Sequence, residues 1–261
     1  MAWNCDGVPL AESSSATFHP ILGQCDDYYV FIIALYHGFK KPNDFNIFLS
    51  DFVKESRTLI QNGIFIRGIH YSFKIYFSTN DTPAKADILC IKHPAGYFSC
   101  PRCKVVGRKL EVVSMKGNKK NIHFLGMTAV KRTDAEYRVV IEPVQRPVNK
   151  KERMKTHHLG RTVLTDIPGF NVVKDVVVDI MHIYYNIIKG LIAKYIGSYG
   201  RIKQEDRPIV AMWCNELNRP QEFARKPRNF FDFLSWKATE LRQFILYTGV
   251  VVLRGYLPEA E

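Results

Sequence analysis

The sequence predicts a mixed α+β (α/β-like) fold. Three observations lead to it: the first 40 residues are rich in β-branched and aromatic side chains, helical spacing begins near residue 43, and alternation returns at residues 69–77. The chain has 261 residues, 46% of them hydrophobic and 24% charged. This composition supports a sizeable core and excludes collagen-like, low-complexity and largely disordered proteins.

The chain begins with three expected strands, over residues 3–10, 18–24 and 28–36. Tight connections between these strands predict an antiparallel meander. A helix of about four turns follows, because apolar residues recur at helical spacing after the capping residues Asn43 and Asp44, and Asn62-Gly63 provides a stop.

Residues 69–77 alternate between two faces and form the clearest expected strand. The segment that follows can start a helix, because Asp81 is a capping residue and Pro83 fits a first helical turn; this helix is expected to reach about Lys92. The order over residues 1–93 is therefore β-β-β-α-β-α. Ribonuclease-H-like domains have this order, although other α+β folds share it.

Residues 94–175 are expected to form a basic insertion outside the main core. Residues 101–160 alone carry 15 basic and 5 acidic side chains, and the whole chain has a formal net charge of +12. Such an excess favours anionic partners, above all nucleic acid.

Regular structure is expected to return over residues 176–261, the helical part that completes the core. Over residues 176–191, Val176-Val-Val178 is expected to lead through Asp179-Ile-Met-His182 into a helix that ends near Gly190. A second helix is predicted over 230–247, with a linker or surface loop over 201–229. No apolar run is long enough to span a membrane, and no signal peptide is recognisable at the N-terminus, so we expect a cytosolic or nuclear protein without a membrane partner.

The six cysteines are too few and too unevenly spaced for a disulfide scaffold, but Cys100-Pro-Arg-Cys103 has the spacing of two zinc ligands. Because the site needs two more, the candidates are His123, His157, His158 and His182. Of the adjacent pair at 157 and 158, only one is expected to bind, since neighbours in extended chain point to opposite sides. Asp179, three residues before His182, is placed to orient it if that segment is helical. The alternative is a pair of buried free thiols.

Two carboxylates are candidates for metal-dependent chemistry. Asp6 lies in the first expected strand and Asp81 ends the fourth, and these strands are neighbours in a β-β-β-α-β unit. Paired carboxylates repel each other unless a cation lies between them, and Mg²⁺ prefers such hard oxygen ligands. Alternatively, Asp6 forms a turn beside Gly7 and Asp81 only caps a helix. Glu240 lies at the edge of the last helix's apolar face, where its simpler role is a solvated partner for Lys237.

Taken together and in order, seven segments resemble the catalytic region of CACTA-type (En/Spm-like) DNA transposases. The resemblance covers nearly the whole chain and is much more specific than any one motif. The segments are Cys5-Asp-Gly-Val-Pro-Leu10, Lys41-Pro-Asn-Asp44, Asn80-Asp-Thr-Pro-Ala-Lys-Ala86, Gly96-Tyr-Phe-Ser-Cys-Pro-Arg-Cys103, His157-His158, Asp179-Ile-Met-His182 and Trp236-Lys-Ala-Thr-Glu-Leu-Arg-Gln-Phe244.

The resemblance implies a ribonuclease-H-like core, interrupted by the zinc-bearing insertion, with a DDE-type catalytic triad of Asp6, Asp81 and Glu240. Asp179 competes with Glu240 for the third position, because similar proteins carry an acidic residue there too. The cofactors implied are a two-metal Mg²⁺ (or Mn²⁺) site and a structural Zn²⁺. For the zinc, the resemblance favours Cys100 and Cys103 with His182 and either His157 or His158.

The partners implied are transposon-end and target DNA in the nucleus, and a second copy of the chain in a homodimer. Because only five residues precede Asp6, the sequence is expected to be a fragment or transposon remnant. Two alternatives remain open: an inactive domesticated protein that binds nucleic acid or a protein partner, and a plain zinc-binding adaptor.

Overall fold

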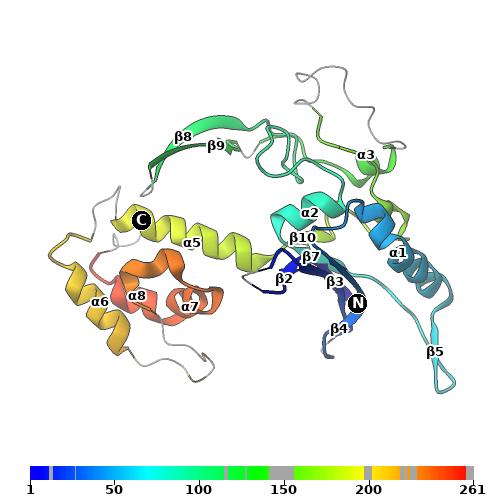
Figure 1. The fold of residues 1–261 in the computed structure, drawn as a ribbon, viewed down its shortest axis with the longest axis horizontal. Coiled ribbons are helices and arrows are strands. Elements are labelled where there is room, and N and C mark those ends of the chain that lie inside the picture. The colour runs from blue at the N-terminus through cyan, green and yellow to red at the C-terminus, as the bar shows by residue number, and fades with distance from the viewer. Residues whose placement is uncertain are drawn as a thin grey trace. The chain divides into compact units, whose positions relative to one another are not determined.

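The computed structural model describes residues 1–11, 14–26, 28–114, 117–126, 128–140, 156–196, 202–217, 221, 223 and 228–256. The chain divides into two compact units, Met1–Val178 and Asp179–Glu261, here called unit 1 and unit 2. Both are visible in Figure 1, and each is described by itself. The expectation of a mixed α+β fold is confirmed, because unit 1 contains a mixed sheet with helices.

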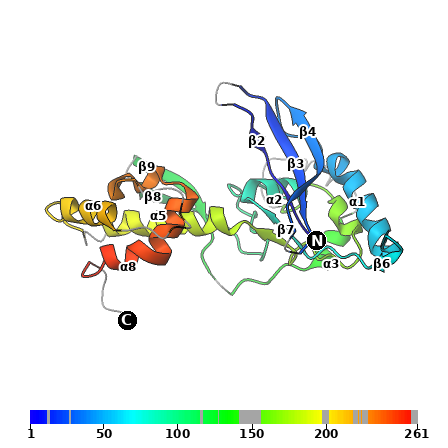
Figure 2. The ribbon, with the colours of Figure 1, turned by 90° about the horizontal axis from the view of Figure 1, so that it is seen from below.

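Unit 1 is built on a six-stranded sheet (Figure 2). Its strands run in the order β10-β7-β1-β3-β2, and β4 pairs with β3. The central strand β1 is parallel to β7 and antiparallel to β3, while β7 is parallel to β10. The bounds are β1 Ala2–Cys5, β2 Val8–Pro9, β3 Thr17–Gln24, β4 Phe31–Gly38, β7 Phe77–Asn80 and β10 Val176–Val178.

The expected meander is confirmed, since β1, β3 and β4 pair in antiparallel fashion. The prediction of one strand over residues 69–77 is wrong. Its first residues form β6 (Ile69–Tyr71), which pairs with β5 (Ile64–Ile66) in a separate hairpin. Arg67 and Gly68 between them both adopt positive φ, as a tight two-residue hairpin turn requires. The strand in the main sheet is the more polar β7, which starts at Phe77.

The long helix α1 (Phe45–Asn62) confirms the predicted helix. The Asp44 side chain accepts hydrogen bonds from the backbone N–H groups of Asn46 and Ile47, and Gly63 ends the helix at φ 67°. Its buried face packs on the sheet, with the rings of Phe52 and Trp3 4.9 Å apart. The shorter α2 (Thr82–Ile88) follows β7 directly and ends before the predicted Lys92.

Residues 94–175 contribute to the core of unit 1, so the expectation that this segment lies outside the main core is wrong. Side chains such as Tyr137, Leu164 and Phe170 are almost fully buried and belong to the same apolar cluster as Trp3 and Leu49. Their short apolar runs lie between polar, Gly and Pro residues, so the sequence pattern does not mark them as core. Within this segment, residues 115, 116, 127 and 141–155 lie outside the described residues; the rest includes β8 (Arg108–Ser114), β9 (Gly117–His123) and α3 (Asp134–Arg138).

The described part of unit 2 is helical: α5 (Ile180–Ile196), α6 (Arg207–Glu216), α7 (Ala238–Gln243) and α8 (Gly249–Val252), with a 3-10 turn over Phe230–Ser235 and a π-helix over Phe244–Thr248. The linker predicted over 201–229 is wrong where α6 forms, because Val210 and Cys214 bury an apolar face. The single helix predicted over 230–247 is divided into shorter pieces. None of the described helices combines the length and the apolar character that a membrane span requires.

Candidate active site and zinc-binding region

The parallel pairing of β1 with β7 places Asp6 and Asp81 at equivalent positions. Asn4 pairs with Thr79 in the ladder, so the residues two positions further along each strand are Asp6 and Asp81. Both follow the carboxyl ends of neighbouring parallel strands. Residues 75 positions apart are thereby brought to one edge of the sheet, which is where open α/β sheets bind ligands.

Both carboxylates also have the local roles that the simpler interpretation assigns to them. The Gly7 N–H donates to Asp6 Oδ1 at 2.7 Å, and the Ala84 N–H donates to Asp81 Oδ1 at 2.6 Å. Asp81 is thus the N-cap of α2. Both side chains are half-buried. These bonds orient the carboxylates and are compatible with metal binding, because a carboxylate oxygen has more than one lone pair.

Side-chain amides tie the two strands together just before the carboxylates. Asn80 is completely buried, and its Nδ2 donates to the Cys5 carbonyl at 2.8 Å while its Oδ1 accepts from Ser78 Oγ at 2.6 Å. In the opposite direction, Asn4 Nδ2 donates to the Thr79 carbonyl. The sequence did not predict this role for Asn80 and Asn4. The one signal in the sequence is the run of polar residues Ser78-Thr-Asn80, which directly follows an apolar segment.

A buried lysine anchors α2 to the outer strand β10, which lies beside β7 in the sheet. Lys85 is 1% exposed, and its Nζ donates to the Val176 carbonyl in β10. Burial, and then the charge of Arg102, lower the pKa of Lys85 to about 7. Helix α2 is therefore joined to β7 through the Asp81 cap and to β10 through Lys85.

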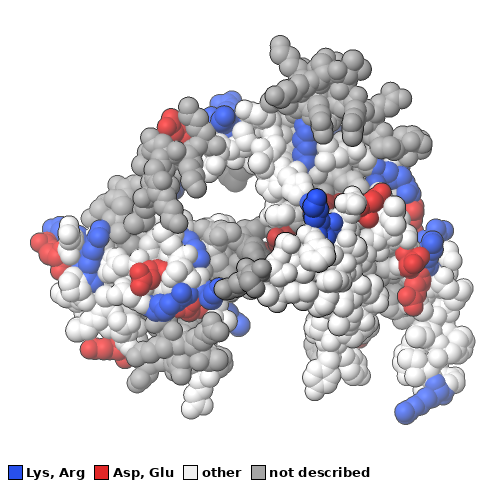
Figure 3. Space-filling model, viewed as in Figure 1, with Lys and Arg blue, Asp and Glu red and all other residues white. Residues whose placement is uncertain are grey.

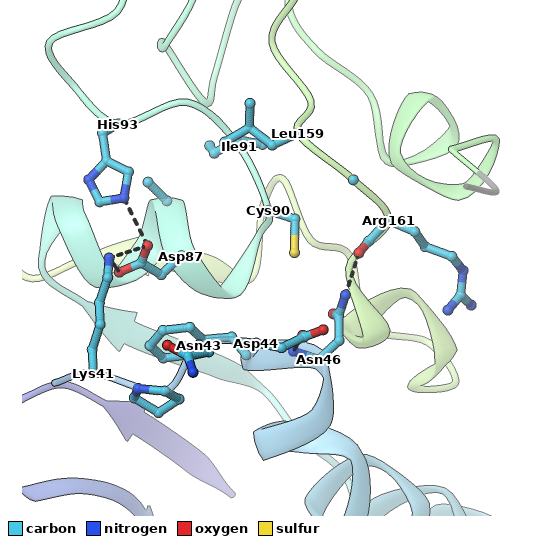
Figure 4. Close-up of a pocket in the computed structure, with 14 residues that line it drawn as sticks. Lys41, Asn43, Asp44, Asn46, Asp87, Cys90, Ile91, His93, Leu159 and Arg161 are labelled. Atoms are coloured by element: carbon cyan, nitrogen blue, oxygen red, sulfur yellow. Dashed lines mark hydrogen bonds and ion pairs between the residues drawn. The ribbon is translucent and has the colours of Figure 1, made fainter. Parts of the chain in front are cut away.

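A cavity of about 410 Å³ lies between the start of α1 and α2 (Figure 4). Lys41 and His93 converge on Asp87, whose carboxylate accepts from Lys41 Nζ at 2.7 Å and contacts His93 Nε2 at 2.8 Å. Cys90 lies at the centre of the view, and the guanidinium of Arg161 points away from Asp87.

The carboxylates of Asp6, after β1, and Asp87, in this cavity, both affect the pKa values of the buried groups Cys5 and His19. Burial, followed by the charges of Asp6 and Asp87, raises the pKa of Cys5 to about 12. Burial lowers the pKa of His19, and the same two carboxylates oppose that shift. Asp87 therefore adds a third acidic group to this region, partly compensated by Lys41.

Comparisons with protein-family models, curated proteins and solved structures find no significant match.

The cysteine pair has a spacing close to that of zinc ligands. Cys100 Sγ and Cys103 Sγ are 3.4 Å apart, whereas two thiolates on one tetrahedral Zn²⁺, each about 2.3 Å from the ion, lie about 3.8 Å apart. Arg132 Nε donates to the Cys100 carbonyl at 2.9 Å and holds this turn. The two thiols thus fit two corners of a zinc site.

The adjacent histidines differ in how their ring nitrogens are used. His157 Nδ1 contacts the Phe98 carbonyl at 2.6 Å and its Nε2 contacts the Tyr137 hydroxyl at 3.1 Å. His158 Nδ1 is buried and finds no hydrogen-bond partner among the described residues. An orphaned buried nitrogen is costly, which makes His158 the better of the two as a ligand.

Both imidazoles are kept in the form that binds metal. Burial lowers the pKa of His157 to about 3 and that of His158 to about 4, and the charge of Arg132 acts in the same direction on both. They are therefore neutral near pH 7, the state in which imidazole is a zinc ligand.

His123 and His182 are the other predicted ligands. His123 ends β9, and its Nε2 is also buried without a partner in the described part of the chain. His182 lies in α5 of unit 2, and its side chain is outside the description. Among the described residues, no three His, Cys, Asp or Glu side chains form a group that could hold a metal ion.

Glu240 is engaged in an ion pair within unit 2. The side chain is 3% exposed, and it accepts from Arg228 Nε at 2.9 Å, Arg228 Nη2 at 2.6 Å and the Lys237 N–H at 2.6 Å. Burial by itself raises the pKa of Glu240, but these bonds outweigh it and lower the pKa to about 2. This environment stabilises the start of α7.

Replacement of Glu240 tests that structural role. Because the folded pKa lies below the ordinary 4.5, the ion pair stabilises unit 2 fully above pH 4.5 and loses this effect as the pH falls towards 2. We expect Glu240→Gln to destabilise unit 2 by about 1–3 kcal/mol at pH 7, with the difference from wild type shrinking below pH 4.5. Chemical denaturation at several pH values measures this, with the exposed Glu205→Gln as control. A difference independent of pH would contradict it.

Asp179, the competitor of Glu240, directly follows the last residue of β10 in the chain. Its Oδ1 accepts from the Met181 N–H at 2.9 Å, which caps the start of α5. Asp179 therefore combines the two features seen at Asp81, a position just after a parallel strand and a role as helix cap.

Lys and Arg side chains are scattered over the described residues of the face shown in Figure 3. Several are paired, among them Lys104 with Glu136 at 2.9 Å and Arg138 with Asp134 at 2.5 Å. Residues 141–155 of the basic segment lie outside the described residues, so its role in binding DNA stays a prediction.

Proposed function

We propose that this chain is the catalytic region of a DDE-type DNA transposase that cleaves and joins DNA strands with divalent metal ions. The observation that carries the proposal is the pairing of β1 with β7, which sets Asp6 and Asp81 side by side at the ends of two parallel strands. Two acidic groups at one sheet edge provide the oxygen ligands that Mg²⁺ prefers.

The topology of the sheet supports the ribonuclease-H-like part of the proposal. A meander of three antiparallel strands is followed by a helix and by a fourth strand that is parallel to the first, and a fifth strand extends the parallel side. This is the order inferred from the first 93 residues, completed by β10. The fold alone does not define an activity, so the proposal depends on the carboxylates.

Asp6 and Asp81 would hold the metal ions, and bound Mg²⁺ would activate a water or a DNA 3′-hydroxyl and stabilise the leaving oxygen. The protein orients the ligands: Gly7 and the first turn of α2 fix one oxygen of each carboxylate. The resemblance leaves two candidates for the third carboxylate, Glu240 and Asp179, and Glu240 is already neutralised by Arg228. Cys100 and Cys103 would provide two ligands of a structural Zn²⁺, and the candidates for the others stay those of the sequence, His182 with His157 or His158.

The test is a nicking assay on supercoiled plasmid DNA. We expect the purified chain to nick DNA in Mg²⁺ or Mn²⁺ and to be inactive in EDTA. Asp179→Asn should abolish nicking, whereas Glu240→Gln should retain it at a temperature where the variant is folded. Absence of nicking in both metals would contradict the enzymatic proposal.

A second candidate function is favoured by the engagement of Glu240: an inactive derivative that binds nucleic acid or a protein partner and keeps the zinc site. In that case the chain would bind DNA without cleaving it. A filter-binding experiment distinguishes the two, because salt-dependent binding without nicking supports the second function.

A further inference from the structure

We infer that Asn80 is a positioning residue that sets the separation of the Asp6 and Asp81 carboxylates for metal binding. This inference rests on the proposed function. It concerns a side chain that does not itself touch the metal but joins the two strands immediately before the ligands.

The first argument is the cost of the arrangement. Ser78 and Asn80 are both 0% exposed within a central strand, where apolar side chains are the norm. Burying an amide costs free energy unless its hydrogen bonds are made. Here they are made, and one of them is to the Cys5 carbonyl of the neighbouring strand. The amide therefore specifies how these two strands meet.

The second argument is location. The last paired residues of the β1–β7 ladder are Asn4 and Thr79, and the bond from Asn80 Nδ2 to the Cys5 carbonyl extends the connection one residue further. The next residues in the chain are Asp6 and Asp81. The Asn80 bond is thus one residue away from both carboxylates.

The third argument is electrostatic. Two carboxylates at one sheet edge repel each other when no cation is bound, and this repulsion pushes the strand ends apart. Mg²⁺ requires oxygen distances near 2.1 Å in almost ideal octahedral geometry, so a small displacement of either ligand weakens binding. The Asn80 bridge opposes that displacement before the metal arrives.

The experiment measures Mn²⁺ affinity by isothermal titration calorimetry, and thermal unfolding in parallel. We expect Asn80→Ala to bind Mn²⁺ at least about tenfold more weakly than wild type. Ser78→Ala is the matched control, because it also removes a buried hydrogen bond to Asn80 but leaves the bond to Cys5. It should lower the unfolding temperature to a similar extent and keep the wild-type affinity.

Equal Mn²⁺ affinity in Asn80→Ala and wild type, or equal losses in Asn80→Ala and Ser78→Ala, would overturn the inference and leave the proposed function intact. If Asn80→Ala does not fold, Asn80→Ser replaces it, since the shorter hydroxyl side chain also removes the Nδ2 donor to the Cys5 carbonyl; an unchanged affinity there overturns the inference too. A wild-type chain whose Mn²⁺ binding is unaffected by Asp6→Asn would overturn both the inference and the proposed function.

Discussion

Asp81→Asn is expected to reduce Mg²⁺-dependent DNA nicking by at least about 100-fold while the protein stays folded. The substitution removes the negative charge that a divalent ion needs and keeps the size of the side chain. Asn is as good an N-cap as Asp, so the hydrogen bond from the Ala84 N–H and the start of α2 are retained. Initial rates on supercoiled plasmid and circular dichroism melting curves measure the two effects.

The matched control for this prediction is Asp51→Asn, which removes the same charge from an exposed position on α1. Asp51 has a side-chain exposure of 92% and pairs only loosely with Lys54. It should nick DNA at the wild-type rate. Equal activity of Asp81→Asn and Asp51→Asn would exclude Asp81 from the mechanism, and Asp6 would then lack the partner that makes a metal site.

The double variant Cys100→Ser, Cys103→Ser is expected to lose about one equivalent of zinc and to lower the unfolding temperature of the protein by roughly 10 °C. Zinc that binds only the folded chain adds its binding free energy to stability. The two thiols lie on a turn that Arg132 holds through the Cys100 carbonyl. Metal content by plasma emission spectroscopy and melting curves with and without chelator measure the change.

Three further variants test the proposed zinc site. Cys25→Ser changes a half-buried thiol outside the site and should retain zinc. His158→Ala should lose zinc, whereas His157→Ala should keep it and melt at a lower temperature, because His157 is bonded to the Phe98 carbonyl and to Tyr137. Zinc content unchanged in the double cysteine variant would refute the site.

The helices and strands that could be predicted are those with a local cause. Helix α1 follows from its apolar spacing, the Asp44 cap and the Gly63 stop, all of which lie within one stretch of chain. The hairpin over residues 64–71 was missed although its Arg67-Gly68 turn is local, because alternation in the second half of the hairpin resembled one longer strand.

Strand β7 could not be found from its own residues. The sequence Phe-Ser-Thr-Asn has little apolar character, and it becomes a strand because β1 and β10 pair with it on both sides. The same holds for α6 and for the buried residues of segment 94–175, whose apolar side chains stand in short runs and meet only in the folded core.

The sequence by itself determined the composition class, the mixed α+β fold, the first meander, α1, and the residue types that predict magnesium and zinc chemistry. It also predicted that the strands of Asp6 and Asp81 are neighbours, which the pairing of β1 with β7 confirms. Only the tertiary structure decided the register of those strands, that Asn80 joins them, and that Arg228 holds Glu240. The reason is physical: capping and periodicity act between residues a few positions apart, whereas strand register, burial and ion pairing depend on side chains that the folded chain brings together.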